Sequence, residues 1–218
     1  MKILKRLSLR KSSNIKLMVC VSLIPSTIFY TFLLIFFYLR GSNLAYVLRD
    51  ISQSCGNIVS WGIFSNIGIL LWASSASVSL FSFFVPIQSN KSRLNSFLLS
   101  GSIFSIILCL DDFFLIHERF INERLVSVFY VILSFVLLIK FWKIIRNNFF
   151  LFFLPSFLLG ISLLIDNLQN LFLSHLLLSQ ILEEGFKFSG ISCWLYFWIF
   201  ISMKKIRSLT KVNNNFYL

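Results

Sequence analysis

Two adjacent acidic residues, Asp111 and Asp112, interrupt a long apolar stretch near the middle of the chain. His117 and Glu118 follow shortly after them, within the segment LDDFFLIHERF. Carboxylates and histidine are ligands that Zn²⁺, Mn²⁺ and Fe²⁺ accept, and the same side chains transfer protons during hydrolysis. Ionisable residues beside apolar runs are costly and usually have a purpose, so we expect a functional site at this stretch.

The composition indicates a membrane protein. Hydrophobic residues make up 57% of the 218 residues, charged residues make up 13%, and the mean hydropathy is +0.85. Soluble domains contain about 45–50% apolar and about 25% charged residues. The net charge of +12 comes mostly from Lys and Arg in the tails and short loops, where topology signals are placed. We therefore expect the lipid bilayer as partner and no nucleic acid.

Six apolar runs are long enough to be transmembrane helices. They cover residues 17–39, 58–85, 96–116, 125–142, about 149–166, and 182–203. The mixed segment 167–182 could extend the fifth helix or lie in the interface. The sequence thus predicts an all-α bundle of six transmembrane helices as one domain over residues 17–203, flanked by basic segments at 1–16 and 204–218.

The distribution of basic residues predicts the orientation of these helices. Fifteen of the 20 Lys and Arg residues fall on the side that carries both tails. Because cytoplasmic loops are enriched in Lys and Arg, both termini are expected to be cytoplasmic. The prediction is a multi-pass protein of the cell membrane, that is, a plasma or inner membrane.

The acidic residues are distributed even more unevenly. All eight fall in the outer connections or in the outer halves of helices. A helix rises about 1.5 Å per residue, which places Asp111, Asp166 and Glu184 about 22, 25 and 30 Å from the inner face. Three helices therefore bring carboxylates to one outer layer, and a shared cation would lower the cost of burying them there.

This layer predicts a cation or metal site. The expected function is a metal-dependent membrane hydrolase acting on a lipid-like substrate, in which Zn, Mn or Fe would activate water. Glu118 or Glu183 would be the catalytic residue that moves the proton. Glu118 is expected to share a helix face with Asp111, and Glu183 to pair with Lys187 one turn on. The candidate metal ligands are Asp111, Asp112, His117, Asp166 and Glu184.

Two other functions fit the same residues. A small cation-coupled transporter would load and release its ion at Asp111 and Asp166. It would need a path through the inner half, where the sequence offers little beyond Asn66 and serines. A structural or assembly subunit of a larger membrane complex would use the charges for pairs between subunits.

The placement of Asp and His at one membrane level resembles the membrane hydrolase superfamily of alkaline ceramidases and progestin-receptor-like proteins. Members of that superfamily place these residues around a metal, so the resemblance implies a metal at the same level here. Its members have seven helices and a HxxxH pair on the last one, whereas the last apolar run here begins with EEGFK. No residue role is carried over from it.

Overall fold

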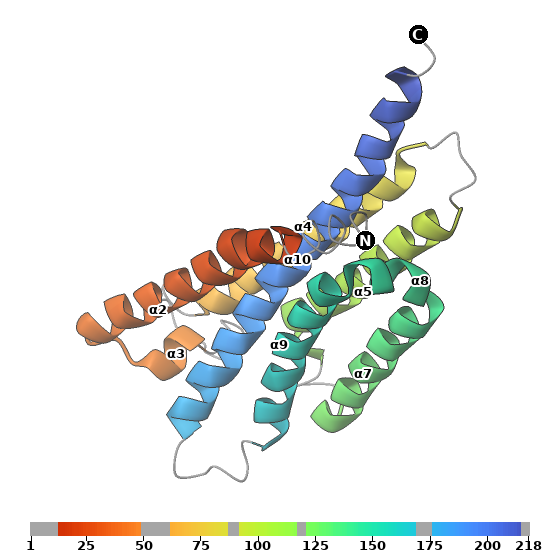
Figure 1. The fold of residues 1–218 in the computed structure, drawn as a ribbon. Coiled ribbons are helices and arrows are strands. Elements are labelled where there is room, and N and C mark those ends of the chain that lie inside the picture. The colour runs from red at the N-terminus through yellow and green to blue at the C-terminus, as the bar shows by residue number, and fades with distance from the viewer. Residues whose placement is uncertain (1–12, 49–61, 87–91, 117–120, 169–175, 215–218) are drawn as a thin grey trace, which may run out of the picture.

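The computed structural model describes residues 13–48, 62–86, 92–116, 121–168 and 176–214, and helices make up nearly all of them (Figure 1). No strand occurs in these ranges. A helical segment that starts at Ser13 leads into the first element. The elements in chain order are the π-helix η1 (Val19–Leu23), the α-helices α2 (Ile24–Leu39), α3 (Leu44–Leu48), α4 (Ile63–Phe84), α5 (Ser92–Phe114), α7 (Glu123–Lys140) and α8 (Trp142–Ile145), the 3₁₀ helix η3 (Arg146–Asn148), and the α-helices α9 (Phe149–Leu168) and α10 (Leu176–Asn214).

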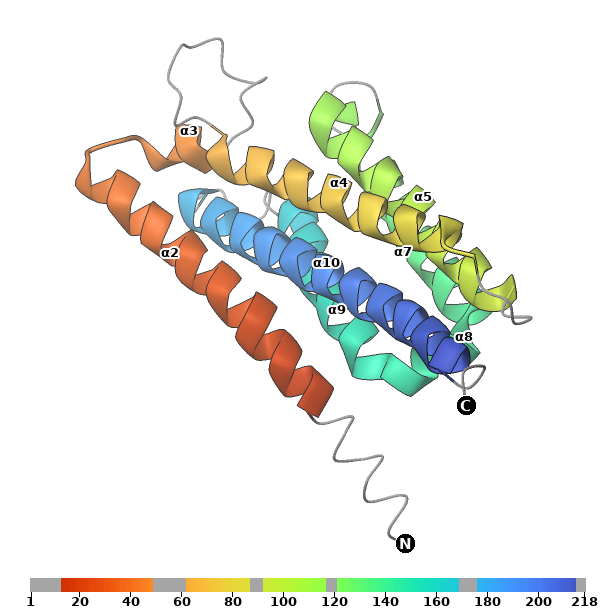
Figure 2. The same ribbon diagram turned by 90° about the horizontal axis from the view of Figure 1, so that it is seen from above.

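Helix α10 is the centre of the bundle. It runs between α2, α4 and α9, as both ribbon views show (Figures 1 and 2). Close packing of membrane helices needs small residues at the contacts. Gly190 of α10 provides one, because a Cβ there would lie 2.8 Å from Cγ of Leu159 on α9. At Gly101 of α5, a Cβ would lie 2.0 Å from the indole of Trp198 on α10.

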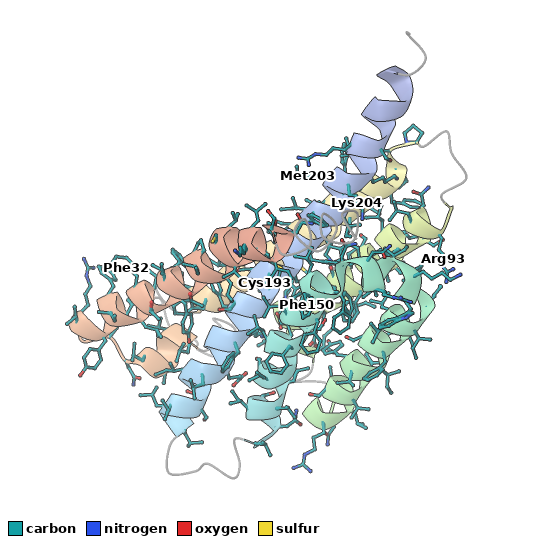
Figure 3. The ribbon with its side chains drawn as sticks, in the orientation of Figure 1. Phe32, Arg93, Phe150, Cys193, Met203 and Lys204 are labelled. Carbon is teal, nitrogen blue, oxygen red and sulfur yellow. The ribbon has the colours of Figure 1, made fainter. Side chains whose placement is uncertain are left out.

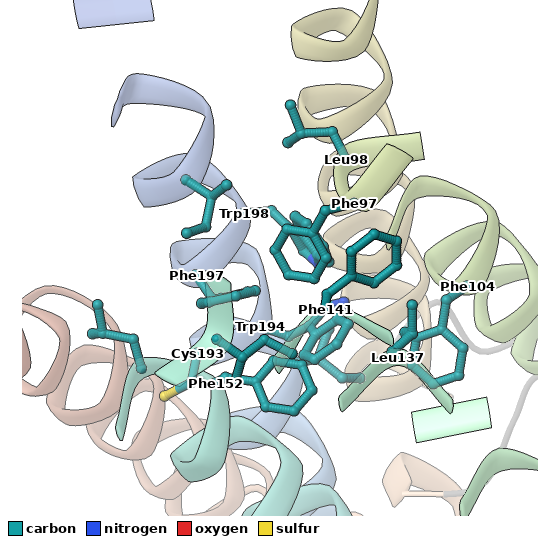
Figure 4. Packing of buried hydrophobic residues seen from close by; sticks show 14 of the residues in the cluster. Phe97, Leu98, Phe104, Leu137, Phe141, Phe152, Cys193, Trp194, Phe197 and Trp198 are labelled. Atoms are coloured by element: carbon teal, nitrogen blue, oxygen red, sulfur yellow. The ribbon is translucent and has the colours of Figure 1, made fainter. Parts of the chain in front are cut away.

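Aromatic side chains fill the interior around α10 (Figure 4). Trp194 and Trp198 are both buried, with ring centroids 5.6 Å apart. Phe97 of α5 lies 5.0 Å from Trp198 and 5.0 Å from Phe141, and Phe152 of α9 lies 5.8 Å from Trp194. Rings in this separation range gain about 0.5–1.5 kcal/mol per pair beyond their area burial.

Five helical segments are long and apolar enough to cross a membrane, which is compatible with a multi-pass membrane protein. They are Ser13–Leu39, Ile63–Phe84, Arg93–Phe114, Trp142–Leu168 and Leu176–Ser208. Large apolar side chains such as Phe32 face outward, whereas Cys193 lies inside the bundle (Figure 3). An apolar exterior is the expected surface in lipid, so the fold class is a helical membrane bundle.

Two basic side chains bind the C-terminal ends of neighbouring helices. The fully buried Lys205 of α10 donates hydrogen bonds to the carbonyl oxygens of Ser82 and Phe83 in the last turn of α4. Arg93 of α5 donates to the carbonyl of Lys140, the last residue of α7, at 3.1 Å. The last four carbonyls of a helix have no partner within it and carry partial negative charge, so both contacts are favourable.

The boundaries differ from the sequence prediction at three places. Helix α10 begins at Leu176, inside the segment 167–182 that was predicted to be mixed, because residues 176–178 are leucines with high helix propensity. The connection between the first two predicted helices, after Leu39, contains the short α3. Helix α5 ends at Phe114 rather than Ile116, since Leu115 has a left-handed backbone with φ +52°.

Candidate functional site

The end of α5 carries the two adjacent aspartates into the bundle. A non-glycine residue in the left-handed region costs free energy, which the burial of the Leu115 side chain offsets because only 1% of it is exposed. This break lies three residues after Asp112, and the helix ends at Phe114. The predicted shared face of Asp111 and Glu118 depended on an unbroken helix and therefore no longer follows.

Asp112 joins three helices. Its Oδ2 accepts a hydrogen bond from Nε1 of Trp72 on α4 at 2.9 Å. Its Oδ1 lies 2.9 Å from Nζ of Lys187 on α10, and the two side chains are 11% and 24% exposed. The ion pair and the indole N–H together offset the free-energy cost of burying this carboxylate in an apolar bundle.

Asp111 faces a different set of neighbours. Only 4% of its surface is exposed, and the hydroxyl of Tyr130 on α7 hydrogen-bonds its carboxylate. A buried carboxylate is stable only with such donors or with a nearby cation. Tyr130 therefore connects α7 to the polar end of α5. Few other side chains of α7 are buried in the bundle.

A cavity of about 410 Å³ lies between α5, α7, α9 and α10, within the size range of pockets for small ligands. Its walls are mostly apolar, from Phe104 and Leu108 of α5 to Leu138 of α7. The ionisable side chains on its lining are Asp111, Asp112, Asp166, Glu183 and Lys187. The cavity thus combines carboxylates from three helices, one ammonium group and a large apolar wall.

One side of the cavity reaches the outer surface of the bundle, between α7 and α9. Val131 and Phe135 of α7 line the cavity and are 48% and 58% exposed. Phe153 of α9 also lines it and is 46% exposed. Residues that line a cavity and also face outward mark its opening. In a bilayer this opening would face acyl chains, because α7 and α9 are both apolar along these positions.

Four of the residues predicted from the sequence line this one cavity, namely Asp111, Asp112, Asp166 and Glu183. Glu184 is absent from the lining, since successive residues of a helix point in directions about 100° apart. His117 and Glu118 lie outside the described residues. Lys187 forms an ion pair with Asp112, and its predicted pairing with Glu183 stays a prediction.

The predicted metal site lacks a complete ligand group in the described part of the chain. Across those ranges, no three or more His, Cys, Asp or Glu residues lie close enough together to hold a metal ion. A tetrahedral or octahedral site requires several such ligands at about 2.0–2.2 Å from the ion. Binding of a metal therefore stays a prediction from the sequence.

Two residues of the site were not predicted from the sequence, Trp72 and Tyr130. Each lies in an apolar run, where the sequence alone does not distinguish it from an ordinary packing residue. The residue types alone could have indicated their role, because the N–H of Trp and the O–H of Tyr need a hydrogen-bond acceptor when they are buried. The nearest acceptors at the same depth are the carboxylates of Asp112 and Asp111.

The helices and the cavity define a membrane-bundle protein with a polar site inside its apolar core. The chain belongs to the family described as "Domain of unknown function (DUF8692)", whose model matches residues 17–200. The matched range includes all five ionisable residues of the cavity lining. Neither the curated proteins nor the solved structures contain a significant match to the chain.

Proposed function

We propose that this protein is a membrane hydrolase whose lipid-like substrate occupies the cavity between α5, α7, α9 and α10. One observation supports the proposal above all others. The cavity has carboxylates at one end, an apolar wall along the rest, and an opening between α7 and α9. An amphiphile from the bilayer would place its polar group among the carboxylates and its chain against the phenylalanines, as in other apolar pockets with few polar groups.

Hydrolysis of an ester or amide requires a group that takes a proton from water and returns it to the leaving group. Glu183 is the residue that we assign to this step, because it lines the cavity and was predicted for it from the sequence. Asp111 and Asp112 are held by Tyr130, Trp72 and Lys187, which suits them to orient the substrate. A bound divalent metal would polarise the scissile carbonyl.

The proposal includes six crossings of the cell membrane with both termini in the cytoplasm. Helix α7 supplies the sixth crossing, since its 18 residues span about 27 Å. Its charges lie at its two ends, Glu123 and Arg124 at the start and Lys140 at the finish. Charged residues at helix ends can reach the headgroup region, so they do not oppose a crossing.

A transporter is less well supported by the packing of the inner half. Phe97, Phe141 and Trp198 are buried on the inner side of the cavity, and the ring centroid of Phe97 lies 5.0 Å from each of the other two. Ion transport needs polar groups or water along the path, and these rings offer little of either.

The test uses the purified full-length protein in lipid nanodiscs with two chromogenic substrates, p-nitrophenyl dodecanoate and dodecanoyl p-nitroanilide. The wild type is expected to hydrolyse at least one of them. Glu183→Gln should lower kcat by about 100-fold or more, the usual contribution of a general acid or base. Glu184→Gln is the matched control, because Glu183 lines the cavity and Glu184 does not.

Equal loss in Glu183→Gln and Glu184→Gln would refute the assignment of Glu183. No hydrolysis by the wild type, before or after loading with Zn²⁺, Mn²⁺ or Fe²⁺, would refute the hydrolase itself. Elemental analysis of the same preparation decides the metal question, because a metal enzyme should retain a stoichiometric amount of the ion.

A further inference from the structure

The connection between α7 and α9 carries a group of basic side chains. Lys140 is the last residue of α7, Lys143 lies in α8, and Arg146 begins η3, and all three side chains are exposed. Lys143 and Arg146 are three residues apart on helical backbone, so their side chains are neighbours. The sequence contains no Asp or Glu between Glu123 and Asp166, so this connection provides no carboxylate side chain beside them.

Helix α5 adds a fourth basic side chain from a distant part of the sequence. Arg93, in the first turn of α5, is exposed and donates a hydrogen bond from its guanidinium to the carbonyl oxygen of Lys140. This contact holds Arg93 beside the end of α7. We call Arg93, Lys140, Lys143 and Arg146 the basic cluster. It lies at the end of the bundle where α7 ends and where α5 and α9 begin.

An apolar surface lies next to the basic cluster. Trp142 is 44% exposed, and its ring centroid lies 6.2 Å from that of Phe149 at the start of α9. Ile139 and Phe150 are also exposed, at 73% and 52%. Trp142 is the first residue of a segment that is long and apolar enough to cross a membrane, and tryptophan is enriched where headgroups meet acyl chains. The basic cluster is therefore placed at headgroup level, with apolar side chains on its bilayer side.

We propose that this end of the bundle binds an anionic phospholipid, with the phosphate at the basic cluster and the acyl chains against Trp142 and Phe150. Charge complementarity favours an anionic lipid over a zwitterionic one, because each Lys or Arg near the membrane surface adds to the attraction. The guanidinium of Arg146 suits this ligand, since its planar fork can donate two parallel hydrogen bonds to one phosphate group. The inference goes beyond the proposed function, because none of these residues lines the cavity.

Trp142 provides a local measurement of lipid binding. The full-length protein is reconstituted in nanodiscs of phosphatidylglycerol and phosphatidylcholine, in which one or the other lipid carries bromine on its acyl chains. Bromine quenches tryptophan fluorescence on contact, and the difference between the wild type and Trp142→Phe isolates the signal of Trp142. We expect phosphatidylglycerol to bind beside Trp142 about fivefold or more tightly than phosphatidylcholine, given the number of basic residues there. Both leaflets of a nanodisc have the same composition, so the result does not depend on the orientation of the protein.

Two arginines at opposite ends of the same connection give a matched pair of variants. Arg146→Gln is expected to lower the preference for phosphatidylglycerol about threefold or more, and Lys143→Gln should act in the same direction. Arg146→Lys should keep part of the preference, since it retains the charge but not the planar fork. Arg124→Gln removes the same charge from an exposed position in the first turn of α7, at the other end of that helix, and should leave the preference unchanged.

Three results would overturn the inference. The first is equal quenching of Trp142 by the two brominated lipids. The second is a preference that Arg146→Gln leaves intact, or that Arg124→Gln lowers as strongly, since net charge alone would then attract the lipid. The third is loss of the preference on addition of inorganic phosphate at matched ionic strength, which would indicate a site for soluble phosphate. None of these measurements depends on hydrolysis in the cavity, so failure of this inference is distinguishable from failure of the proposed function.

Discussion

The ammonium group of Lys187 on α10 lies 2.9 Å from the carboxylate of Asp112 on α5. Trp72 of α4 donates to the second oxygen of the same carboxylate, also at 2.9 Å. Helices α4 and α5 and the distant α10 therefore meet at one acidic side chain. Removing one member of such a contact is more costly than removing both, because the remaining charge loses a partner in an apolar setting.

Lys187→Met and Asp112→Asn are each expected to lower the free energy of unfolding by about 1–3 kcal/mol. The double variant should lose less than the sum of the two, since the coupling within a contacting pair is about 0.5–3 kcal/mol. Unfolding in mixed detergent micelles, followed by circular dichroism, gives the three values. Strictly additive losses would show that the pair makes no net contribution.

Gly101→Ala should destabilise the bundle by about 1–3 kcal/mol through overpacking. The added Cβ would lie 2.0 Å from Cη2 of Trp198, whose ring is held by its aromatic neighbours. Gly160→Ala is the matched control in another helix, since no atom lies within 4 Å of a Cβ there. Thermal unfolding in detergent measures both. A loss in the control as large as in Gly101→Ala would contradict the packing explanation.

Lys205→Met should also destabilise the protein, by about 1–3 kcal/mol, because the carbonyls of Ser82 and Phe83 lose their donor. Lys204→Met at the exposed neighbouring position should have a much smaller effect. Hydrogen exchange at the end of α4 provides a second measurement, and protection there should fall only in Lys205→Met. Equal effects of the two changes would show that net charge, not the capping contact, is responsible.

Reporter fusions test the topology. Fusions after Lys91, Arg146 and the C-terminus are expected to give cytoplasmic signals, and fusions after Gln53 and Glu123 should not. The fusion after Arg146 tests α7 in particular, because a helix that stayed on one side of the membrane would place Glu123 and Arg146 together. A C-terminus found outside would reject the count of six crossings.

The helices could be predicted from the sequence because long apolar runs leave few alternatives in a bilayer. The ends of the helices could not. The left-handed Leu115 depends on a buried site for its side chain, which a list of apolar residues does not reveal. The early start of α10 at Leu176 depends on leucines whose neighbours are polar. Hydropathy alone left these leucines either as an extension of the fifth helix or as an interfacial segment.

The position of each acidic residue along its helix could also be predicted, since helical rise converts sequence position to distance along the helix axis. Their lateral arrangement required the structure. Asp111, Asp166 and Glu183 line one cavity, whereas Glu184, at nearly the same height, does not. The cavity itself had no signal in the sequence, because it results from how α7 and α9 pack and not from any single residue type.

The central position of α10 has a consequence for the biogenesis of the protein. During translation, α2, α4, α5 and α9 leave the ribosome before the helix on which most of them pack. At about 5–20 residues per second, α10 follows α9 by several seconds. Until then, Asp112 lacks its ion-pair partner Lys187, and the Trp198 side chain that packs against Gly101 is not yet present. Insertion of the early helices must therefore rely on their own hydropathy, and a nascent chain stalled before α10 would present an inserted but unassembled bundle to membrane quality control.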